Sequence, residues 1–273
     1  MLFRSTRDHL DFHHTMEEYA TAKRMLFAPG DSVAPQWAVL NADDPASQGM
    51  VPAAPSQVIW YGTTAGADLR AENIESGFSG LRFDVNYRGR REEFHSPLVG
   101  HINVSNILAA VGAGLSYGLD LEVIARGIAA CLPVPGRFER VDEGQPFLVV
   151  VDYAHTDDAL RNLLETARPM AVKRLLTVFG AGGERDRTKR PLMGMVAARL
   201  SDVVVITSDN PRSEDPLRII DEVKRGAEPE TRQGNAEVMA IADRREAIVR
   251  SEEHTSELQS HLNLVCRLLL EKK

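Results

Sequence analysis

The sequence predicts an α/β fold with a mostly parallel sheet, because apolar strands alternate with helices throughout its second half. The strands are FLVVVDY (147–153), RLLTVFG (174–180) and DVVVITSD (202–209), and the helices that follow them cover about 157–167, 191–200 and 216–225. Continuously apolar strands are typical of a parallel sheet whose two faces are both covered by helices.

The first half predicts a separate α/β region with shorter and more polar strands. Helical periodicity covers about 16–27, 104–117 and 121–130, and short strands are expected at 36–44, 57–62, 81–87 and 92–98. The run LPVPGRFERVD then places two prolines and a glycine after the last of these helices. Proline breaks helices, so we expect a hinge or boundary at about 133–137, with domains at 1–134 and 135–249.

Composition narrows the classes of function. The 273 residues are 43% hydrophobic, which suits one large domain or two of ordinary size. Acids and bases are interspersed at a net charge of −7. The sequence therefore has no basic stripe of the kind that binds nucleic acid. No stretch reaches the roughly 18 apolar residues of a membrane span, so we expect no membrane insertion. Cys131 and Cys266 are the only cysteines and have no metal-ligand spacing. Nothing suggests a disulfide framework, so we expect the reducing cytoplasm.

Polar, chemically useful residues follow each strand of the second half. The strand ends read DYAH (152–155), FGAGGERDR (179–187) and SDNPR (208–212). Ligands of parallel sheets bind at the carboxyl ends of the strands. A glycine run alone is weak evidence, because glycine suits any tight turn. The basic residues beside it are equally consistent with a solvated surface.

These strand ends resemble the Mur ligase family, and so do two segments of the first half. The segments are TRDHLDFHHTMEEYATAKRMLF (6–27) and LVGHINVSNILAAVGAGLSYGL (98–119). The resemblance covers about 5–249 and implies an incomplete central ATP-binding domain followed by a Rossmann-like C-terminal domain. DYAHTDDAL departs from the family motif where Asp157 replaces proline, a substitution that a first helical position tolerates.

In the first segment the resemblance implies a magnesium site. His9 matches a histidine that helps to hold Mg²⁺, and Lys23 matches a lysine that is carbamylated. Carbamylation converts a cation into a carboxylate-like anion, which supplies the hard oxygen ligands that Mg²⁺ prefers. On the residues alone, a histidine before a helix and a lysine within one are more often surface residues.

The resemblance also implies nucleotide contacts. The matching residues are Asn103, Asn106, Arg137, Asp152 and His155. An amide side chain can donate to and accept from a purine edge, although either asparagine could instead cap the helix that begins there. The planar, permanently charged arginine suits ATP phosphates, and the aspartate matches a ribose contact. Thr156 or Asp157 could cap the helix that follows the first strand end.

The GERDR and DNPR contexts imply that the amino acid is meso-diaminopimelate. In the family, the arginine matched by Arg212 recognises the carboxylate at the far end of that amino acid, which lysine lacks. Arg185 and the run Asp209, Asn210 and Pro211 match positions that face the same ligand. A buried arginine or carboxylate left unpaired costs roughly 1–3 kcal/mol or more, so this arginine favours diaminopimelate over lysine.

The implied reaction adds meso-diaminopimelate to UDP-N-acetylmuramoyl-L-alanyl-D-glutamate in peptidoglycan biosynthesis. ATP phosphorylates the D-glutamate side chain, and the amine attacks the resulting acyl phosphate. Mg²⁺, ATP and these two substrates are the expected partners of a cytoplasmic monomer. The alternatives are another ligase of the superfamily, such as a dipeptide-adding or folylpolyglutamate-type enzyme, and a non-catalytic remnant that binds only the amino acid.

Two further expectations concern the ends of the sequence. The family's GTNGKT-type phosphate loop and its uridine-nucleotide-binding domain should lie upstream of residue 1, so we expect no turnover by this chain alone. The run RSEEHTSELQSH (250–261) resembles the in-frame translation of a common sequencing-library adapter. We therefore expect 250–273 to be a cloning or assembly artefact, the alternative being an amphipathic terminal helix.

Overall fold

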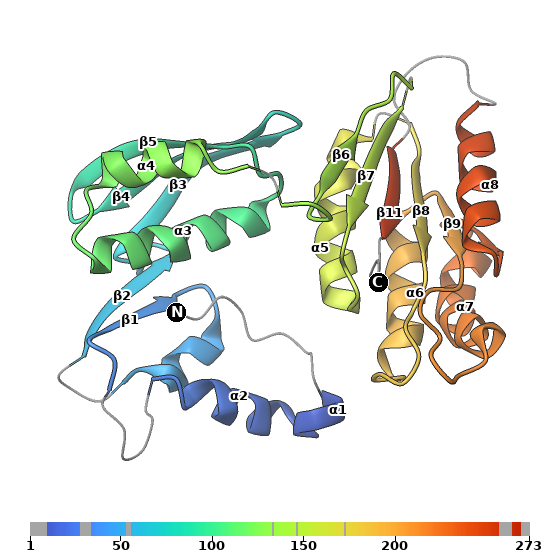
Figure 1. Cartoon of the computed structure of the whole chain (residues 1–273), viewed down its shortest axis with the longest axis horizontal. Coiled ribbons are helices and arrows are strands. Elements are labelled where there is room, and N and C mark those ends of the chain that lie inside the picture. The colour runs from blue at the N-terminus through green and yellow to red at the C-terminus, as the bar shows by residue number, and fades with distance from the viewer. Residues whose placement is uncertain are drawn as a thin grey trace. The chain divides into compact units, whose positions relative to one another are not determined.

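The chain forms two compact α/β units, Met1–Leu132 and Pro133–Lys273, each with its own sheet (Figure 1). The computed structural model describes residues 10–27, 34–52, 56–132, 134–145, 147–171, 173–256 and 264–268. The first sheet combines parallel and antiparallel strands and the second is mostly parallel, which confirms the predicted α/β class. Within these ranges no helix combines the length and apolar character needed to cross a membrane.

The first unit has a five-stranded sheet in the order β1-β2-β3-β4-β5. Its strands are β1 (Trp37–Asn41), β2 (Gln57–Gly62), β3 (Leu69–Gly77), β4 (Gly80–Tyr87) and β5 (Arg90–Ser96). The first three strands are parallel and the last two add in antiparallel pairs. Its helices are α1 (Leu10–His13), α2 (Met16–Arg24), the 3-10 helix η1 (Pro45–Met50), α3 (His101–Ser116) and α4 (Leu121–Ala129).

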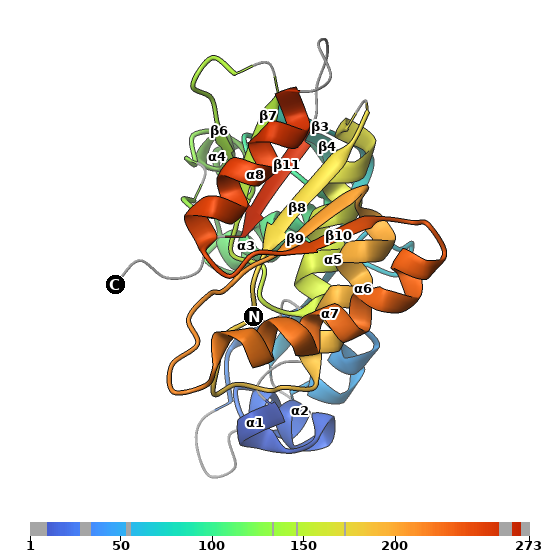
Figure 2. The same ribbon diagram turned by 90° about the vertical axis from the view of Figure 1, so that its right-hand side faces the viewer.

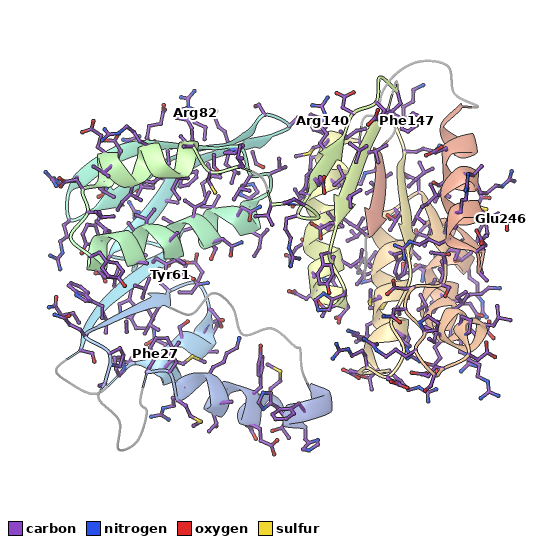
Figure 3. All side chains as sticks on the ribbon, in the orientation of Figure 1. Phe27, Tyr61, Arg82, Arg140, Phe147 and Glu246 are labelled. Carbon is purple, nitrogen blue, oxygen red and sulfur yellow. The ribbon has the colours of Figure 1, made fainter. Side chains whose placement is uncertain are left out.

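Two hydrophobic clusters hold the first unit together. One packs α3 and α4 on the sheet, and the other gathers apolar side chains around Phe27 and the start of β1. Phe27 and Tyr61, labelled in Figure 3, are 2% and 0% exposed. Burial raises the pKa of Tyr61 to about 12, although a hydrogen bond with Ser105 of α3 opposes this rise. The tyrosine therefore serves the core as a neutral phenol.

The second unit has a six-stranded sheet in the order β10-β9-β8-β11-β7-β6. Its strands are β6 (Glu139–Val141), β7 (Leu148–Asp152), β8 (Leu175–Phe179), β9 (Val203–Ile206), β10 (Glu237–Ala240) and β11 (Leu264–Leu268). Every pairing is parallel except that of β6 with β7. Its helices are α5 (Asp157–Ala167), the 3-10 helix η2 (Arg168–Met170), α6 (Lys189–Leu200), α7 (Pro216–Arg232) and α8 (Arg244–Ser256).

Helices cover both faces of this sheet, as the continuous apolar runs predict (Figure 2). Alternate strand residues point to opposite faces. Leu175 and Phe179 accordingly join the cluster with α5, α6 and α7, whereas Leu176 and Val178 join the cluster with Ala247 of α8. The strand β11 and the end of α8 fall within 250–273, where the origin of the sequence stays a prediction.

Helices α6 and α7 approach each other closely at two glycines. A Cβ atom at Gly226 would lie 1.8 Å from the carbonyl oxygen of Pro191, and one at Gly194 would lie 2.0 Å from that of Val223. Real Cβ atoms do not approach so closely, so neither position admits a side chain. This contact fixes the two helices that follow β8 and β9, and with them the turns at the ends of those strands.

We expect Gly226→Ala to lower the free energy of unfolding by about 1–3 kcal/mol or more, because the new methyl group must force the two helices apart. Gly127→Ala in α4 is the matched control, since a Cβ there meets nothing within 4 Å. The control should stabilise the chain by roughly 0.5–1 kcal/mol through its helix propensity. Urea unfolding followed by circular dichroism measures both, and a fully stable Gly226→Ala variant would contradict the prediction.

Candidate functional site

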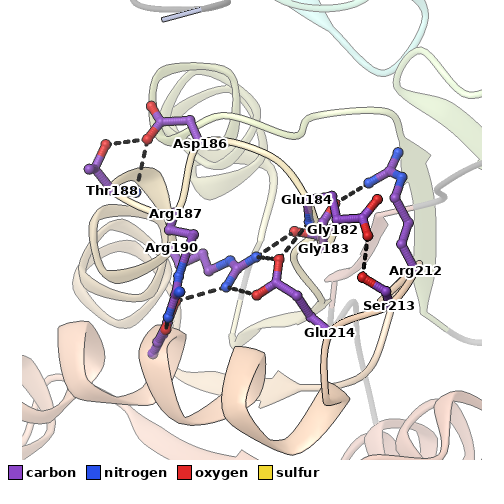
Figure 4. Close-up of polar contacts among 11 residues, drawn as sticks. Gly182, Gly183, Glu184, Asp186, Arg187, Thr188, Arg190, Arg212, Ser213 and Glu214 are labelled. Carbon is purple, nitrogen blue, oxygen red and sulfur yellow. Dashed lines mark hydrogen bonds and ion pairs between the residues drawn. The ribbon is translucent and has the colours of Figure 1, made fainter. Parts of the chain in front are cut away.

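The candidate amino-acid site lies at the carboxyl ends of β8 and β9 in the second unit. These strands are parallel neighbours, with Phe179 paired to Ile206, so the turns that follow them leave the same edge of the sheet. We call residues 180–188 the glycine turn and residues 207–215 the DNPR turn. Figure 4 shows the two turns in direct contact. The sequence-predicted residues Arg185, Asp209, Asn210, Pro211 and Arg212 are thus brought to one edge.

Close backbone contact requires glycine at specific positions in the glycine turn. The Gly183 N–H donates a hydrogen bond of 2.8 Å to the carbonyl oxygen of Asn210. A Cβ atom at Gly183 would lie 1.9 Å from the carbonyl oxygen of Pro211, and one at Gly180 would lie 2.5 Å from that of Thr207. These glycines are therefore needed because the DNPR turn approaches so closely. The tightness of the glycine turn itself would not require them.

The side chain of Arg212 reaches back across the gap between the turns. Its Nη1 donates to the carbonyl oxygen of Gly183, and the hydroxyl of Ser213 donates to the carboxylate of Glu184 (Figure 4). Both Glu184 and Arg212 have left-handed backbones, with φ values of 50° and 51°. Such a conformation costs a non-glycine residue about 1–3 kcal/mol, so the contacts between the turns hold it in place.

Behind the two turns lies a buried arginine, Arg190 of α6, with only 1% of its side chain exposed. Its Nη1 and Nη2 donate to the two carboxylate oxygens of Glu214 at 3.0 and 2.8 Å. It also donates to the carbonyl oxygen of Gly182 at 3.1 Å and to Glu222 of α7 at 2.8 Å. The hydrogen bond from this arginine lowers the pKa of Glu214 to about 2, helped by the N–H of Glu184.

Asp209 is the most buried acid of the DNPR turn, with 4% of its side chain exposed. Its Oδ1 accepts a hydrogen bond of 3.1 Å from Arg244 of α8. Its Oδ2 is buried and makes no hydrogen bond within the described residues. Burial raises the pKa of Asp209, while hydrogen bonding to Asn210 and the charge of Arg244 oppose this rise. A cationic group of a ligand is the chemical partner that this carboxylate would favour.

The end of β7 gathers two predicted nucleotide residues around Tyr153. The guanidinium of Arg137 lies 4.9 Å from the centre of the Tyr153 ring. His155 places Nδ1 3.1 Å from the carbonyl oxygen of Tyr153, and the two rings meet edge to face. The exposed arginine is therefore held over a ring at the strand end, where a nucleotide phosphate could approach it.

Asp152 anchors the same region through its backbone contacts. Its two carboxylate oxygens accept from the N–H groups of Phe138 and Ala154, each at 2.8 Å. Burial raises the pKa of Asp152, and these N–H groups lower it in part. The hydroxyl of Thr156 accepts from the N–H of Ala159 at 3.1 Å, which confirms Thr156 as the predicted cap of α5.

In the first unit, Lys23 lies on α2 with its Nζ 4.4 Å from the centre of the Tyr19 ring. The helix is capped by Thr15, whose hydroxyl accepts from the N–H of Glu18 at 3.1 Å. His9 lies outside the described residues. Within the described ranges, no group of three or more His, Cys, Asp or Glu side chains is placed to hold a metal ion.

The two asparagines of the first unit do not cap α3, so that alternative is wrong. The cap residue is Gly100, and no side chain caps the helix. Asn103 instead donates to the carbonyl oxygen of Val99 at 2.8 Å, and Asn106 donates to the side-chain oxygen of Asn103 at 3.0 Å. The two amides therefore form a connected pair along the first two turns of the helix.

Several charged residues of the site were not predicted from the sequence. They are Arg190, Glu214, Glu222 and Arg244. A basic run before a helix and an acid in a polar turn are typical of solvated surface, so their spacing carries no signal of burial. The apolar residues that follow Arg190 could have suggested only that it lies near a helix interface.

Comparison with known families assigns both units. The model described as the Mur ligase middle domain matches residues 2–114, and that of the Mur ligase glutamate ligase domain matches residues 136–258. This chain belongs to the Mur ligase family. Its Mur ligase middle and C-terminal domains agree with the resemblance that the motifs indicated.

The Mur ligase relatives include several named UDP-N-acetylmuramoyl-L-alanyl-D-glutamate--2,6-diaminopimelate ligase. That of Solibacter usitatus is 60% identical over 217 residues, covering 80% of this chain and 44% of the relative. That of Geobacillus thermodenitrificans is 47% identical over 247 residues, covering 89% and 50%. The chain thus spans about half the length of the curated relatives it matches.

Solved Mur ligase structures show the same fold. A structure titled as a diaminopimelate ligase of this kind has a TM-score of 0.59 at 34% identity, and the match covers 96% of this chain and 53% of that one. MurF from Acinetobacter baumannii has a TM-score of 0.75 at 17% identity, covering 97% and 55%, and this likeness shows the fold alone.

We expect Gly183→Ala to lower the free energy of unfolding by about 1–3 kcal/mol, because its methyl group would overlap the Pro211 carbonyl. Gly182→Ala is the neighbouring control, since its Cβ would meet Arg212 Nη1 at an ordinary 3.5 Å. Thermal and urea unfolding of both variants measure the difference. Equal stability of the two variants would show that the turns do not approach as closely as described.

The lowered pKa of Glu214 predicts a pH dependence of stability. A carboxyl whose pKa is lower in the folded chain contributes stability above its unfolded pKa, which is lost as pH falls through the folded value. Wild-type stability should therefore fall between about pH 4.5 and 2, and Glu214→Gln should flatten this fall. Glu228→Gln, which removes an exposed carboxylate of α7, is the control. Urea unfolding at several pH values measures this dependence. A Glu214→Gln variant whose unfolding free energy falls with pH as steeply as that of wild type would refute the prediction.

Proposed function

We propose that this chain carries the amino-acid site and part of the ATP site of a ligase that adds meso-diaminopimelate to UDP-N-acetylmuramoyl-L-alanyl-D-glutamate. The observation that carries the proposal is the placement of Arg212, an exposed arginine whose guanidinium is oriented by the Gly183 carbonyl at the carboxyl edge of the sheet. The names of relatives at 60% and 47% identity support the same activity. Peptidoglycan biosynthesis is the corresponding process.

The amino-acid site suits a ligand with two carboxylates and two ammonium groups. A guanidinium has five N–H donors, so Arg212 can bind a carboxylate while one nitrogen contacts the Gly183 carbonyl. Arg185 supplies a second exposed cation from the glycine turn. The buried carboxylate of Asp209 and the amide of Asn210 offer oxygen atoms to an ammonium group. We assign these residues and Pro211 to meso-diaminopimelate, since lysine lacks the second carboxylate.

The nucleotide residues come from both units. In this proposal Asn103 and Asn106 contact the adenine, Arg137 the phosphates and Asp152 the ribose, with His155 beside them. The connected amides of α3 and the arginine held over Tyr153 support the assignment, because both sets are fixed in orientation by contacts within their own unit. The chemistry of each group matches the part of ATP assigned to it.

A magnesium site is assigned to His9 and Lys23 on the family resemblance. The lysine amine can react with carbon dioxide to give a carbamate and a proton, and the carbamate oxygens would then hold Mg²⁺. Lys23 is half-buried and its Nζ lies over the Tyr19 ring, so its amine is less solvated than that of an exposed lysine. When bound, Mg²⁺ offsets the negative charge of the phosphates during transfer.

The reaction proceeds in two steps. The D-glutamate carboxylate attacks the terminal phosphorus of ATP, which gives an acyl phosphate and ADP. The diaminopimelate amine then attacks the acyl carbon, phosphate leaves, and the nitrogen loses a proton to form the amide. The residues of the second unit contribute by binding and orienting the amine for this attack. We further propose a cytoplasmic monomer, as the family resemblance implies.

The proposal is tested by isothermal titration calorimetry of the 273-residue chain with meso-diaminopimelate and with ATP. We expect Arg212→Ala to weaken meso-diaminopimelate binding by about 10- to 100-fold, the range of a charge-assisted hydrogen-bonded pair, and to change ATP binding less than about twofold.

Arg218→Ala is the matched control, since this arginine is 84% exposed on α7. Equal losses for both ligands in Arg212→Ala would contradict the assignment. A wild-type chain that binds meso-diaminopimelate but not ATP would favour the amino-acid-binding remnant instead.

A further inference from the structure

Arg190 cannot contact a ligand directly, yet it connects both turns of the amino-acid site. Its side chain is 1% exposed, which leaves no surface for a substrate to touch. A buried guanidinium is retained where its charge is balanced by nearby partners. The partners here are two carboxylates and one backbone carbonyl, and two of the three belong to the turns that carry Arg185 and Arg212.

The link between the turns runs through Glu214 of the DNPR turn. Its Oε1 accepts from Arg190 Nη2 at 2.8 Å and from the backbone N–H of Glu184 at 2.5 Å. Its Oε2 accepts from Arg190 Nη1 at 3.0 Å. Arg190 Nη2 donates in addition to the carbonyl oxygen of Gly182. The Arg190–Glu214 ion pair is therefore bonded to the backbone of the glycine turn at two residues, Gly182 and Glu184, as Figure 4 shows.

We propose that Arg190 and Glu214 form a positioning pair, which fixes the spacing between the two exposed arginines and so selects an amino acid with a second carboxylate. The inference rests on the proposed function, because it names the residues that give that site its selectivity. Arg185 and Arg212 stand on different turns, so any change in the distance between the turns changes the ligand that fits. A flexible site would hold a longer or shorter amino acid equally well.

Glu222 provides a matched comparison within the same network. It accepts from Arg190 Nη1 at 2.8 Å and also pairs with Arg187, but it lies on α7 and bonds to the backbone of neither turn. Loss of either glutamate removes one ion pair from the same buried arginine. Only the loss of Glu214 also releases the N–H of Glu184. A purely structural role predicts similar effects of the two changes, whereas positioning predicts different ones.

Glutamine is the suitable replacement because it keeps the size of the side chain. Its amide has one acceptor oxygen where the carboxylate has two. In Glu214→Gln the side chain must therefore give up either the two-pronged bond to Arg190 or the N–H of Glu184. Arg190→Lys keeps the positive charge but loses the planar fork, so it should show an intermediate effect.

The experiment titrates the full chain and its variants with meso-diaminopimelate and with L-lysine. We expect Glu214→Gln to weaken meso-diaminopimelate binding at least about tenfold and to reduce its preference over lysine, while Glu222→Gln stays within about twofold of wild type. In an Arg212→Ala background, Glu214→Gln should add less than about twofold, because its effect acts through Arg212. Equal effects of the two glutamate variants on binding and preference would overturn the proposal.

Hydrogen exchange of the ligand-free chain gives an independent measurement. The amide of Glu184 should exchange at least about tenfold faster in Glu214→Ala than in Glu222→Ala, because only the first change removes its acceptor. Unchanged exchange in Glu214→Ala would overturn the pairing even without a ligand. If wild type binds no meso-diaminopimelate, the proposed function fails. If it binds and Glu214→Gln binds equally well, the function stands and the positioning pair fails.

Discussion

The close approach of two turns at the ends of β8 and β9 is the constraint on which the amino-acid site depends. The parallel pairing of these strands delivers both turns to one edge, and the Gly183 N–H bonds directly to the Asn210 carbonyl. No side chain fits at Gly183, so the turn that supplies cationic residues must also supply glycine. The positive φ values of Glu184 and Arg212 follow from the same approach, because each residue bends its chain toward the other turn.

Packing of the core and charge in the site are coupled through α6 and α7. The glycines at 194 and 226 let these helices touch through backbone atoms, which brings Arg190 of α6 within hydrogen-bonding distance of Glu222 of α7. A wider spacing would remove one of the two carboxylates that pair with the buried arginine, and loss of a partner in a buried ion pair is destabilising. The packing of the two helices thus determines where this ion pair can form, and the ion pairs hold the turns that carry the candidate site residues.

The sequence predicts the second unit better than the first because its strands are uniformly apolar. The α/β class, three sheet strands, the edge that bears the motifs and a cap at Thr156 or Asp157 follow from pattern alone. The strand Leu69–Gly77 was missed because half-exposed polar residues interrupt its apolar alternation. The capping role offered for Asn103 failed because α3 begins earlier, at His101, with Gly100 as its cap residue. Burial of Arg190 depends on contacts between distant segments, which local spacing does not encode.

The two candidate subsites differ in how the chain builds them. The residues assigned to the amino acid all stand on two adjacent turns of one unit, and the described contacts that orient Arg212 and Asp209 are made within that unit. The residues assigned to the nucleotide are divided, with Asn103 and Asn106 in the first unit and three others in the second. In the proposed function, selectivity for the amino acid is therefore a local property of the second unit, whereas nucleotide contacts are assigned in each unit. Binding of the amino acid can accordingly be examined separately from phosphoryl transfer.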